Sequence, residues 1–173
     1  MKLNEHIFLI GFMGCGKSTN AKYLSKVTGA KQMEMDQEIV KDQGMAITEI
    51  FAKFGEPYFR DLETELIRSM NGKEPMVVSC GGGAVLREEN VALMKEVGKI
   101  VLLTATLETI YGRVKDSTDR PILNGNMTPE YIAELMEKRR PKYEAAADFV
   151  VSTDMKNTRE ICEEILGKME RRR

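Results

Sequence analysis

Short apolar runs alternate with longer amphipathic stretches along this chain. The apolar runs are bounded by turn residues and predict five strands, at Ile7–Ile10, Gln32–Met35, Met76–Ser79, Ile100–Thr104 and Phe149–Ser152. The amphipathic stretches predict helices over about Lys17–Val27, Gln37–Asp42, Thr48–Phe54, Pro57–Met70, Glu88–Val97, Thr106–Lys115, Thr128–Arg140 and Asn157–Glu170. Because short, mostly apolar strands alternate with helices, the pattern predicts an α/β fold, with a parallel sheet covered on both faces.

The length of the chain fits a single domain, residues 1–173. A domain usually has ~100–200 residues, and no repeat, low-complexity segment or Pro/Gly/Ser linker divides this sequence. One internal stretch stands apart: residues 116–127 contain Pro121, Asn124, Gly125 and Asn126 and few apolar residues. This composition predicts a mobile loop between two helices.

The charge balance and the cysteines narrow the possible partners. Lys and Arg number 26 and Asp and Glu 27, which gives a net charge of −1. General binding to nucleic acid or to an anionic membrane needs a basic surplus, so neither partner is expected. No apolar run approaches the ~20 residues of a membrane-spanning helix. Cys15, Cys80 and Cys162 show no disulfide or zinc spacing, which fits a reducing compartment and predicts a cytoplasmic protein.

Two features near the N-terminus are weighed and set aside. The N-terminus resembles a short lipoprotein signal, because Lys2 is followed by an apolar run that starts at Ile7 and leads to Cys15. Against this interpretation, Glu5 interrupts the basic stretch. His6 is the single histidine, which excludes a multi-histidine metal site, and it precedes the first predicted strand. We therefore expect His6 to take no part in the chemistry.

The strongest motif follows the first predicted strand and opens a helix. The string Gly-Phe-Met-Gly-Cys-Gly-Lys-Ser-Thr at residues 11–19 matches Gly-x-x-x-x-Gly-Lys-[Ser/Thr], a phosphate-binding loop. Its glycines let successive amides converge on an anion, and the helix N-terminus adds its positive dipole end. Lys17 can reach the β- and γ-phosphates, and the Ser18 hydroxyl can ligate Mg²⁺. The motif predicts a nucleoside triphosphate site, with Cys15 present as a small residue rather than a redox centre.

Other sequence features favour a small-molecule kinase over the other users of this loop. The guanine signature Asn-Lys-x-Asp is absent, which disfavours a GTPase, and the chain is short for a motor. The run Met76–Ser79 ends in serine and leads into a triple glycine instead of ending in the usual aspartate. The loop at 116–127 carries Arg120 and has the character of a lid, which a kinase needs to exclude water.

At this point the sequence resembles the shikimate kinase family, P-loop kinases related to the nucleoside monophosphate kinases, nearly end to end. The phosphate-loop string is typical of that family, and Glu34-Met35-Asp36 stands where the family has Asp-x-Asp. Three more strings match in order: Gly-Glu-x-x-Phe-Arg-x-x-Glu at 55–63, the glycines 81–83, and Arg-Pro-Ile-Leu at 120–123. Arg-x-Pro-x-Tyr at 139–143 completes the set.

The resemblance implies a fold and a reaction. The fold is a three-layer sandwich around a five-stranded parallel sheet of order 2-3-1-4-5, with an acceptor-binding segment at about 34–63 and a mobile lid at about 116–127. The reaction is ATP-dependent phosphorylation of the 3-hydroxyl of shikimate by a cytoplasmic monomer, with Mg²⁺. One departure concerns the metal: Glu34 replaces the first aspartate of the family pair and is expected near Mg²⁺ through water.

The resemblance also assigns roles to residues of the acceptor site. Arg60 and Arg139 hold the shikimate carboxylate with their guanidinium groups. Asp36 accepts from the ring hydroxyls and orients or deprotonates the attacking one. The glycines at 81–83 let the backbone approach the ring.

For ATP, the implied residues are those of the loop and two arginines. Lys17 and Arg120 neutralise charge on the transferred phosphoryl group, and both are catalytic together with Asp36. Arg113 lies against adenine. The remaining nucleotide ligands are Gly14, Cys15, Gly16, Ser18 and Thr19, and the metal ligands are Ser18 and Glu34.

Several of these residues have structural alternatives. Arg60 could form surface ion pairs with Glu56 and Glu63 along one helix, and Arg113 could be a solvated helix residue. Asp36 could cap the helix that follows it. Of the neighbouring Arg139 and Arg140, only one can face a pocket, and the register with Tyr143 favours Arg139.

Two other functions stay open from the sequence alone. One is a gluconate- or nucleoside-monophosphate-type kinase on the same scaffold, which would use different acceptor residues. The other is a non-catalytic nucleotide-binding domain. The presence of Lys17, Asp36 and Arg120 counts against the second.

Overall fold

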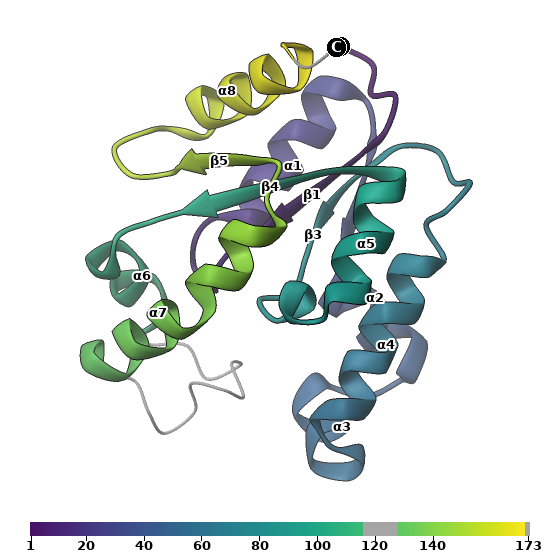
Figure 1. Ribbon diagram of the computed structural model, residues 1–173, viewed down its shortest axis with the longest axis vertical. Helices are drawn as coiled ribbons and strands as arrows, with labels where there is room; N and C mark the ends of the chain where they lie inside the picture. The colour runs from purple at the N-terminus through teal and green to yellow at the C-terminus, as the bar shows by residue number, and fades with distance from the viewer. Residues whose placement is uncertain (116–127, 172–173) are drawn as a thin grey trace.

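The computed structural model describes residues 1–115 and 128–171. Its five strands form one parallel sheet in the order β2-β3-β1-β4-β5, which confirms the predicted topology (Figure 1). The strands are β1 (His6–Ile10), β2 (Lys31–Glu34), β3 (Met76–Ser79), β4 (Gly98–Thr104) and β5 (Phe149–Ser152). All five residues of β1 and all four of β3 are buried, as expected of strands covered on both faces.

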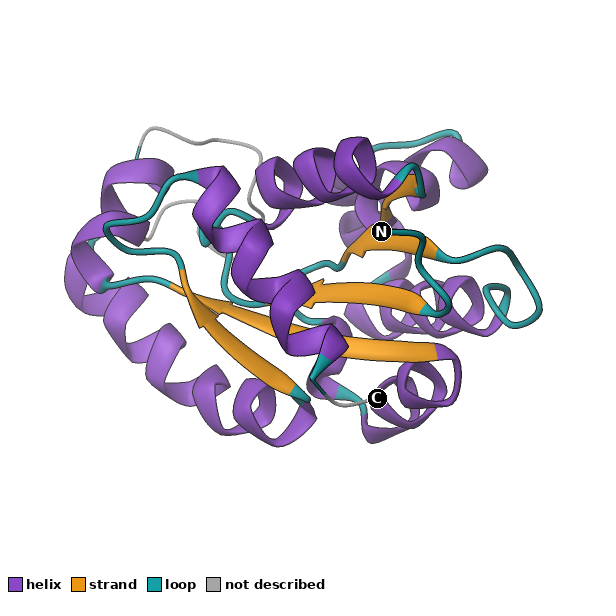
Figure 2. Cartoon of the chain, turned by 90° about the horizontal axis from the view of Figure 1, so that it is seen from above, coloured by secondary structure: helices purple, strands orange, loops and turns teal. Residues whose placement is uncertain are grey.

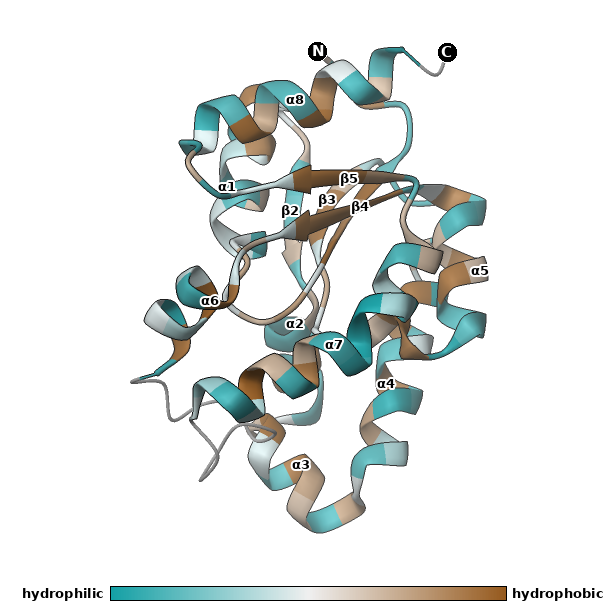
Figure 3. Ribbon diagram, turned by 60° about the vertical axis from the view of Figure 1, so that its left-hand side comes forward, coloured by the Kyte–Doolittle hydropathy of each residue, from teal (hydrophilic) through white to brown (hydrophobic). Residues whose placement is uncertain are grey.

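The helices lie on both sides of the sheet (Figure 2). They are α1 (Lys17–Thr28), α2 (Met35–Gln43), α3 (Ile47–Phe54), α4 (Glu56–Arg68), α5 (Glu88–Val97), α6 (Leu107–Val114), α7 (Pro129–Ala146) and α8 (Thr158–Glu170), with a short 3₁₀ turn η1 (Ala84–Leu86). Helices α1 and α8 pack together on one side, whereas α5 and α7 contact β4 and α4 contacts α5. The apolar strands lie between these layers (Figure 3).

A second, smaller hydrophobic cluster lies apart from the core around the sheet. It joins α2, α3 and α4 through the buried side chains Ile39, Ile50 and Phe59. Helix α3 is therefore packed on its neighbouring helices, at the end of the molecule away from α8 (Figure 1).

The structure corrects three sequence predictions. Strand β2 ends at Glu34, and Met35 begins α2; Met35 is fully buried, and an apolar residue fits either element. Helix α7 runs through Pro141 instead of ending at Arg140. A proline inside a helix costs about 3 kcal/mol, and here Tyr143 and Ala146, beyond the proline, gain burial that offsets this cost.

The third correction concerns His6, which is the first residue of β1 and lies at 3% exposure. Its Nε2 lies 3.1 Å from the Met70 carbonyl oxygen, and its Nδ1 accepts from the Met76 amide at 3.0 Å. These contacts join the start of β1 to the start of β3 and to Met70, between α4 and β3, at the end of the sheet opposite the phosphate loop. No helix among the described residues is long and apolar enough to span a membrane.

Candidate active site

The phosphate loop connects the end of β1 to the start of α1, and its backbone requires glycine. Gly11, Gly14 and Gly16 have φ angles of 143°, 80° and 98°, which side-chain-bearing residues rarely adopt. A Cβ atom at Gly11 would also lie 2.5 Å from the Leu103 carbonyl oxygen. The loop therefore curls tightly against β4 and presents Gly16 at the N-terminus of α1, as the motif predicts.

Lys17 is the first residue of α1, and its ammonium group lies within the phosphate loop. Its Nζ donates to the carbonyl oxygens of Gly11 at 2.7 Å and Phe12 at 3.1 Å. Two neutral carbonyls hold the charge weakly compared with a phosphate, which forms charge-assisted hydrogen bonds. The side chain is thus placed to exchange these contacts for phosphate oxygens.

Beside Lys17, the Ser18 hydroxyl and the Glu34 carboxylate lie in contact with each other. The Ser18 hydroxyl donates to Oε2 of Glu34 at 2.9 Å and lies 3.5 Å from the Ser79 hydroxyl. Gln32 donates to the other Glu34 oxygen at 2.8 Å, which fixes the carboxylate at the end of β2. Within the described ranges no three His, Cys, Asp or Glu residues are grouped as metal ligands. Two protein oxygens suit Mg²⁺, which prefers oxygen and keeps several of its waters.

A cavity of about 510 Å³ lies along the outer side of the phosphate loop. Arg113 from α6 lines it, and Nη1 of this residue donates to the Gly14 carbonyl oxygen at 2.6 Å. Arg113 is exposed, as the alternative of a solvated helix residue expects, and this hydrogen bond also joins it to the loop. The cavity is also lined by phosphate-loop residues that the sequence analysis assigned to ATP: Gly14, Cys15, Gly16, Lys17, Ser18 and Thr19.

The far wall of this cavity comes from a segment that the sequence analysis missed. It consists of the residues between β5 and α8 and the first residues of α8: Thr153, Lys156, Asn157, Thr158 and Ile161. Asp154 ties this segment to the start of α6, because its carboxylate accepts from the Thr106 amide and the Thr109 hydroxyl, each at 3.0 Å. The position of the segment at the carboxyl end of the last parallel strand was the available signal.

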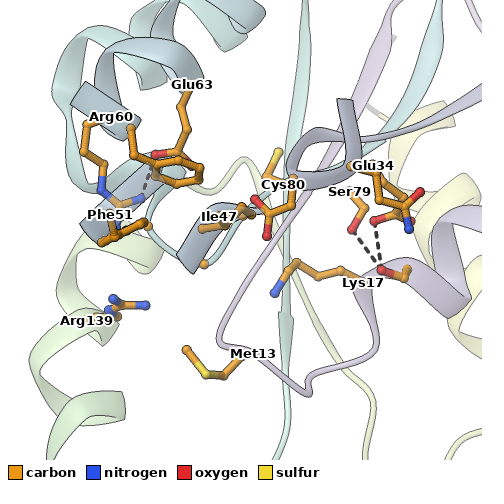
Figure 4. Close-up of a pocket in the computed structure, with 17 residues that line it drawn as sticks. Met13, Lys17, Glu34, Ile47, Phe51, Arg60, Glu63, Ser79, Cys80 and Arg139 are labelled. Carbon is orange, nitrogen blue, oxygen red and sulfur yellow. Dashed lines mark hydrogen bonds and ion pairs between the residues drawn. The ribbon is translucent and has the colours of Figure 1, made fainter. Parts of the chain in front are cut away.

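A second cavity, of about 360 Å³, also borders Lys17 and is lined by all the predicted acceptor residues (Figure 4). Its polar lining includes Lys17, Ser18, Glu34, Asp36, Arg60, Glu63, Ser79, the glycines 81–83 and Arg139. Met13, Ile47, Phe51 and Phe59 form its apolar wall. This combination can hold a small molecule that has both charged groups and an apolar face.

Arg60 is buried in the wall of this cavity, at 7% exposure. Its Nη1 donates to Glu63 Oε1 at 2.6 Å, and Nη2 and Nε donate to Glu56 Oε1 at 3.0 and 3.3 Å. Burial opposes the charge, but Glu63 and Glu56 outweigh this effect and raise the pKa of Arg60. The alternative of helical ion pairs was right about the partners and wrong about a surface position.

Glu63 is a site residue that the sequence analysis treated only as a partner of Arg60. Its side chain is completely buried, and Oε2 has no hydrogen-bond partner among the described residues. Burial raises the pKa of Glu63 to about 7; the Arg60 charge opposes the rise and the Asp36 charge adds to it. Sequence spacing could show the pairing with Arg60 but not this burial.

The triple glycine lies directly on these charged groups. A Cβ atom at Gly81 would be 2.9 Å from Asp36 Oδ1 and 3.0 Å from Glu63 Oε2. One at Gly83 would be well under 3.0 Å from three atoms of the Arg60 guanidinium. The loop therefore needs glycine because it packs flat against Arg60 and between two carboxylates.

Two buried hydrogen-bond partners hold this loop from behind. The Tyr143 hydroxyl donates to the Gly82 carbonyl oxygen at 2.6 Å. Asn90, which is fully buried, donates to the Ala84 carbonyl oxygen at 2.8 Å and accepts from Thr64 on α4 at 2.7 Å. The loop is thus fixed to α7 by Tyr143 and, through Asn90 of α5, to α4, and these contacts have no local sequence signature.

Arg139 and Arg140 lie on different faces of α7. Arg139 is 6% exposed, lines the cavity, and its Nη1 is buried without a hydrogen-bond partner among the described residues. Arg140 is exposed and pairs with Glu137 at 2.6 Å. The structure therefore places Arg139 in the cavity, as the register with Tyr143 predicted.

Asp36 lies in the first turn of α2 and lines the acceptor cavity. The capping position of α2 is Glu34, so the alternative that Asp36 caps this helix is wrong. Arg120 and the predicted lid at 116–127 lie outside the described residues. The structure thus brings together Lys17, Asp36, Arg60 and Arg139 around one cavity beside the phosphate loop (Figure 4).

A phosphate loop at the carboxyl edge of a five-stranded parallel sheet, beside a cavity for a small anion, defines a P-loop kinase. The comparisons then identify the family. A family model described as shikimate kinase matches residues 13–170. The chain belongs to the shikimate kinase family.

Curated relatives named shikimate kinase agree with this assignment. The protein from Thermodesulfovibrio yellowstonii is 42% identical over 167 residues, which cover 96% of this chain and 96% of that protein. The protein from Persephonella marina is 44% identical over 165 residues, covering 95% and 99%. The similarity extends over nearly the whole length of each.

Solved structures show the same fold. Shikimate kinase from Acinetobacter baumannii, in complex with shikimate, superposes with a TM-score of 0.91 at 28% identity and covers 98% of this chain and 94% of that chain. Shikimate kinase from Aquifex aeolicus gives 0.81 at 38% identity, covering 95% and 96%. A gluconokinase from Sinorhizobium meliloti gives 0.63 at 17% identity, which shows a shared fold alone.

Proposed function

We propose that this protein transfers the γ-phosphoryl group of ATP to the 3-hydroxyl of shikimate, giving shikimate 3-phosphate and ADP in aromatic amino-acid biosynthesis. The observation that carries the proposal is the pair of buried arginines, Arg60 and Arg139, in the cavity beside Lys17. Buried cations of this kind fit a small carboxylate, and the membership of the shikimate kinase family supports shikimate as that carboxylate.

The acceptor is held by residues from three parts of the chain. Its carboxylate binds to Arg139, which has a buried Nη1 without a partner among the described residues, and to Arg60. The backbone at 81–83 approaches the ring because no side chains intervene. We assign the segment 34–63 to acceptor binding, since α2, α3 and α4 supply Asp36, Phe51 and Arg60 to the cavity.

Phosphoryl transfer needs an oriented hydroxyl and charge stabilisation. Asp36 accepts the hydrogen bond of the attacking hydroxyl and holds it toward the phosphate loop. Lys17 leaves the carbonyls of Gly11 and Phe12 to bind the transferred phosphoryl group, and we assign Arg120 the same role. Arg113 and the segment after β5 enclose the adenosine portion of ATP.

Ser18 and Glu34 would hold Mg²⁺, Glu34 through water. The fit rests on their contact at 2.9 Å beside the phosphate loop and on an all-oxygen donor set. When bound, the ion neutralises charge on the β- and γ-phosphates. We further propose a monomer that works in the cytoplasm; the free, buried cysteines support a reducing compartment.

The test is a coupled assay of ADP release with Mg²⁺, ATP and millimolar acceptor. Shikimate should support turnover, whereas gluconate and nucleoside monophosphates should not. ADP release that does not depend on shikimate, or an equal rate with gluconate, would contradict the proposal. Lys17→Met should abolish turnover and leave the unfolding transition unchanged; full activity in this variant would remove the phosphate loop from the mechanism.

A further inference from the structure

The acceptor cavity contains one more carboxylate than the reaction requires. Asp36 accepts from the substrate hydroxyl, and the second carboxylate, Glu63, has no proposed part in phosphoryl transfer. It lies deeper, with no exposed surface, and its Oε2 has no hydrogen-bond partner among the described residues. Asp36 Oδ1 and Glu63 Oε2 both lie within 3.0 Å of the Cβ position of Gly81, so the two carboxylates face the same point.

Arg60 is already partly neutralised before any acceptor binds. A guanidinium has five N–H donors, and Glu63 and Glu56 accept from three of its nitrogens. An acceptor carboxylate at Arg60 would therefore be the third carboxylate around one guanidinium, with Asp36 close by. Three anions around one cation repel one another, and the repulsion is least screened at Glu63, because its side chain is completely buried.

Charged and titratable groups face Glu63 from every neighbouring element. Arg60 comes from its own helix, Asp36 from α2, Cys80 from the end of β3 and Arg87 from the start of α5. Arg139 of α7 lines the same cavity. Among the carboxylates, Glu63 is fully buried whereas Glu56 is half-exposed, so ionisation is least favourable at Glu63.

We infer that Glu63 takes up a proton when the carboxylate of the acceptor binds to Arg60, an inference that rests on the proposed function. The arriving carboxylate shares the positive charge that holds Glu63 ionised, so the neutral form of Glu63 becomes favoured. The proton comes from solvent or buffer and binds to Oε2, the oxygen without a partner. Net charge in the cavity is thereby conserved on binding, and the neutral carboxyl group gains a donor that faces the acceptor.

Titration calorimetry of wild-type protein with shikimate tests this inference. Binding is measured at pH 7.5 in buffers with small and large ionisation enthalpies, and the dependence of the heat on the buffer gives the number of protons taken up. Burial raises the pKa of Glu63 to about 7, so roughly a quarter of the molecules already carry the proton at this pH. We expect uptake of about 0.3–0.75 protons for each shikimate bound. Uptake below about 0.1 would overturn the inference.

Two variants assign the proton to its site. Glu63→Gln cannot ionise and should bind shikimate without a buffer-dependent heat. Glu56→Gln is the matched control, because Glu56 pairs with the same guanidinium but is half-exposed, and this variant should keep the uptake. Uptake that persists in Glu63→Gln would place the proton on another group and refute the inference.

The outcomes separate this inference from the proposed function. If Glu63→Gln does not fold, the wild-type measurement alone decides, because absent uptake refutes the inference. Binding without uptake removes the role of Glu63 and leaves the kinase intact. No heat with millimolar shikimate in any buffer, together with no shikimate-dependent ADP release, would instead refute the proposed function itself.

Discussion

Replacing Gly83 by alanine should weaken acceptor binding and leave the nucleotide site intact. The new methyl group would lie well under 3.0 Å from three atoms of the Arg60 guanidinium, whereas ordinary contact begins at 3.4 Å. Arg60 cannot move away freely, because Glu63 and Glu56 hold it at 2.6 and 3.0 Å. The loop cannot move freely either, since Asn90 holds the Ala84 carbonyl and Tyr143 holds that of Gly82.

The magnitude follows from the hydrogen bonds that the displacement breaks. A hydrogen bond to a charged group contributes about 1.5–3 kcal/mol. Loss of one such bond between Arg60 and the acceptor carboxylate corresponds to a rise of about 10- to 150-fold in the Kd for shikimate. The ATP cavity does not include Gly83, so the KM for ATP should stay within about twofold.

Calorimetry gives the Kd for shikimate and the Kd for ATP, and the coupled assay gives the KM values for both substrates. Gly82→Ala is the matched control: its Cβ would lie 3.2 Å from Nη1 of Arg139, the end of a flexible side chain that can give by a few tenths of an ångström. This variant should lose much less affinity than Gly83→Ala. A Kd for shikimate within twofold of wild type in Gly83→Ala would refute the steric reasoning, as would an equal loss of ATP affinity.

Three further predictions concern stability and the metal. Glu63 has a folded pKa of about 7, above its ordinary value of 4.5, so the folded state binds its proton more tightly and loses stability as pH rises through this window. Relative to Glu63→Gln, wild-type protein should therefore lose about 2–3 kcal/mol of unfolding free energy between pH 5 and pH 8 in urea titrations; a difference that stays constant over this range would contradict the burial argument. Glu34→Ala should raise the Mg²⁺ concentration for half-maximal turnover by about tenfold, because it leaves Ser18 as the remaining protein ligand, and an unchanged Mg²⁺ dependence would remove Glu34 from the metal site. Gly167→Ala, within α8 and with nothing within 4 Å of its Cβ position, should stabilise the fold by about 0.5–1 kcal/mol, measured by chemical denaturation; a loss of stability would show that α8 packs more closely there.

Much of the fold could be predicted because local patterns carry it. Four of the five strands, all except β2, are short and mostly apolar runs, and the phosphate loop depends on glycines at fixed spacing, so both can be recognised in the sequence. Helix α7 continues past Pro141 because Tyr143 and Ala146 are buried by distant elements. Such packing outweighs the tendency of Pro141 to end a helix, and it cannot be predicted from the neighbouring residues in the sequence.

The same distinction applies to the site. Arg60 and Arg139 could be placed by motif and register, and both lie in the cavity. The complete burial of Glu63 could not be predicted, because it depends on which elements meet at the carboxyl edge of the sheet. The segment at 153–158 was missed, although it follows the last predicted strand and therefore lies at the same edge. Asn90 likewise acts through a carbonyl and a hydroxyl that no spacing rule connects to it.

The separate hydrophobic cluster of α2, α3 and α4 has a consequence for local unfolding. Helix α4 is anchored at both ends, by Phe59 in the small cluster and by Ile67 in the core around the sheet. Opening the small cluster exposes few apolar side chains and leaves the sheet core buried, so it requires far less free energy than global unfolding. Arg60 and its buried partner Glu63 lie between the two anchors, so this ion pair stands where a stable unit meets a less stable one.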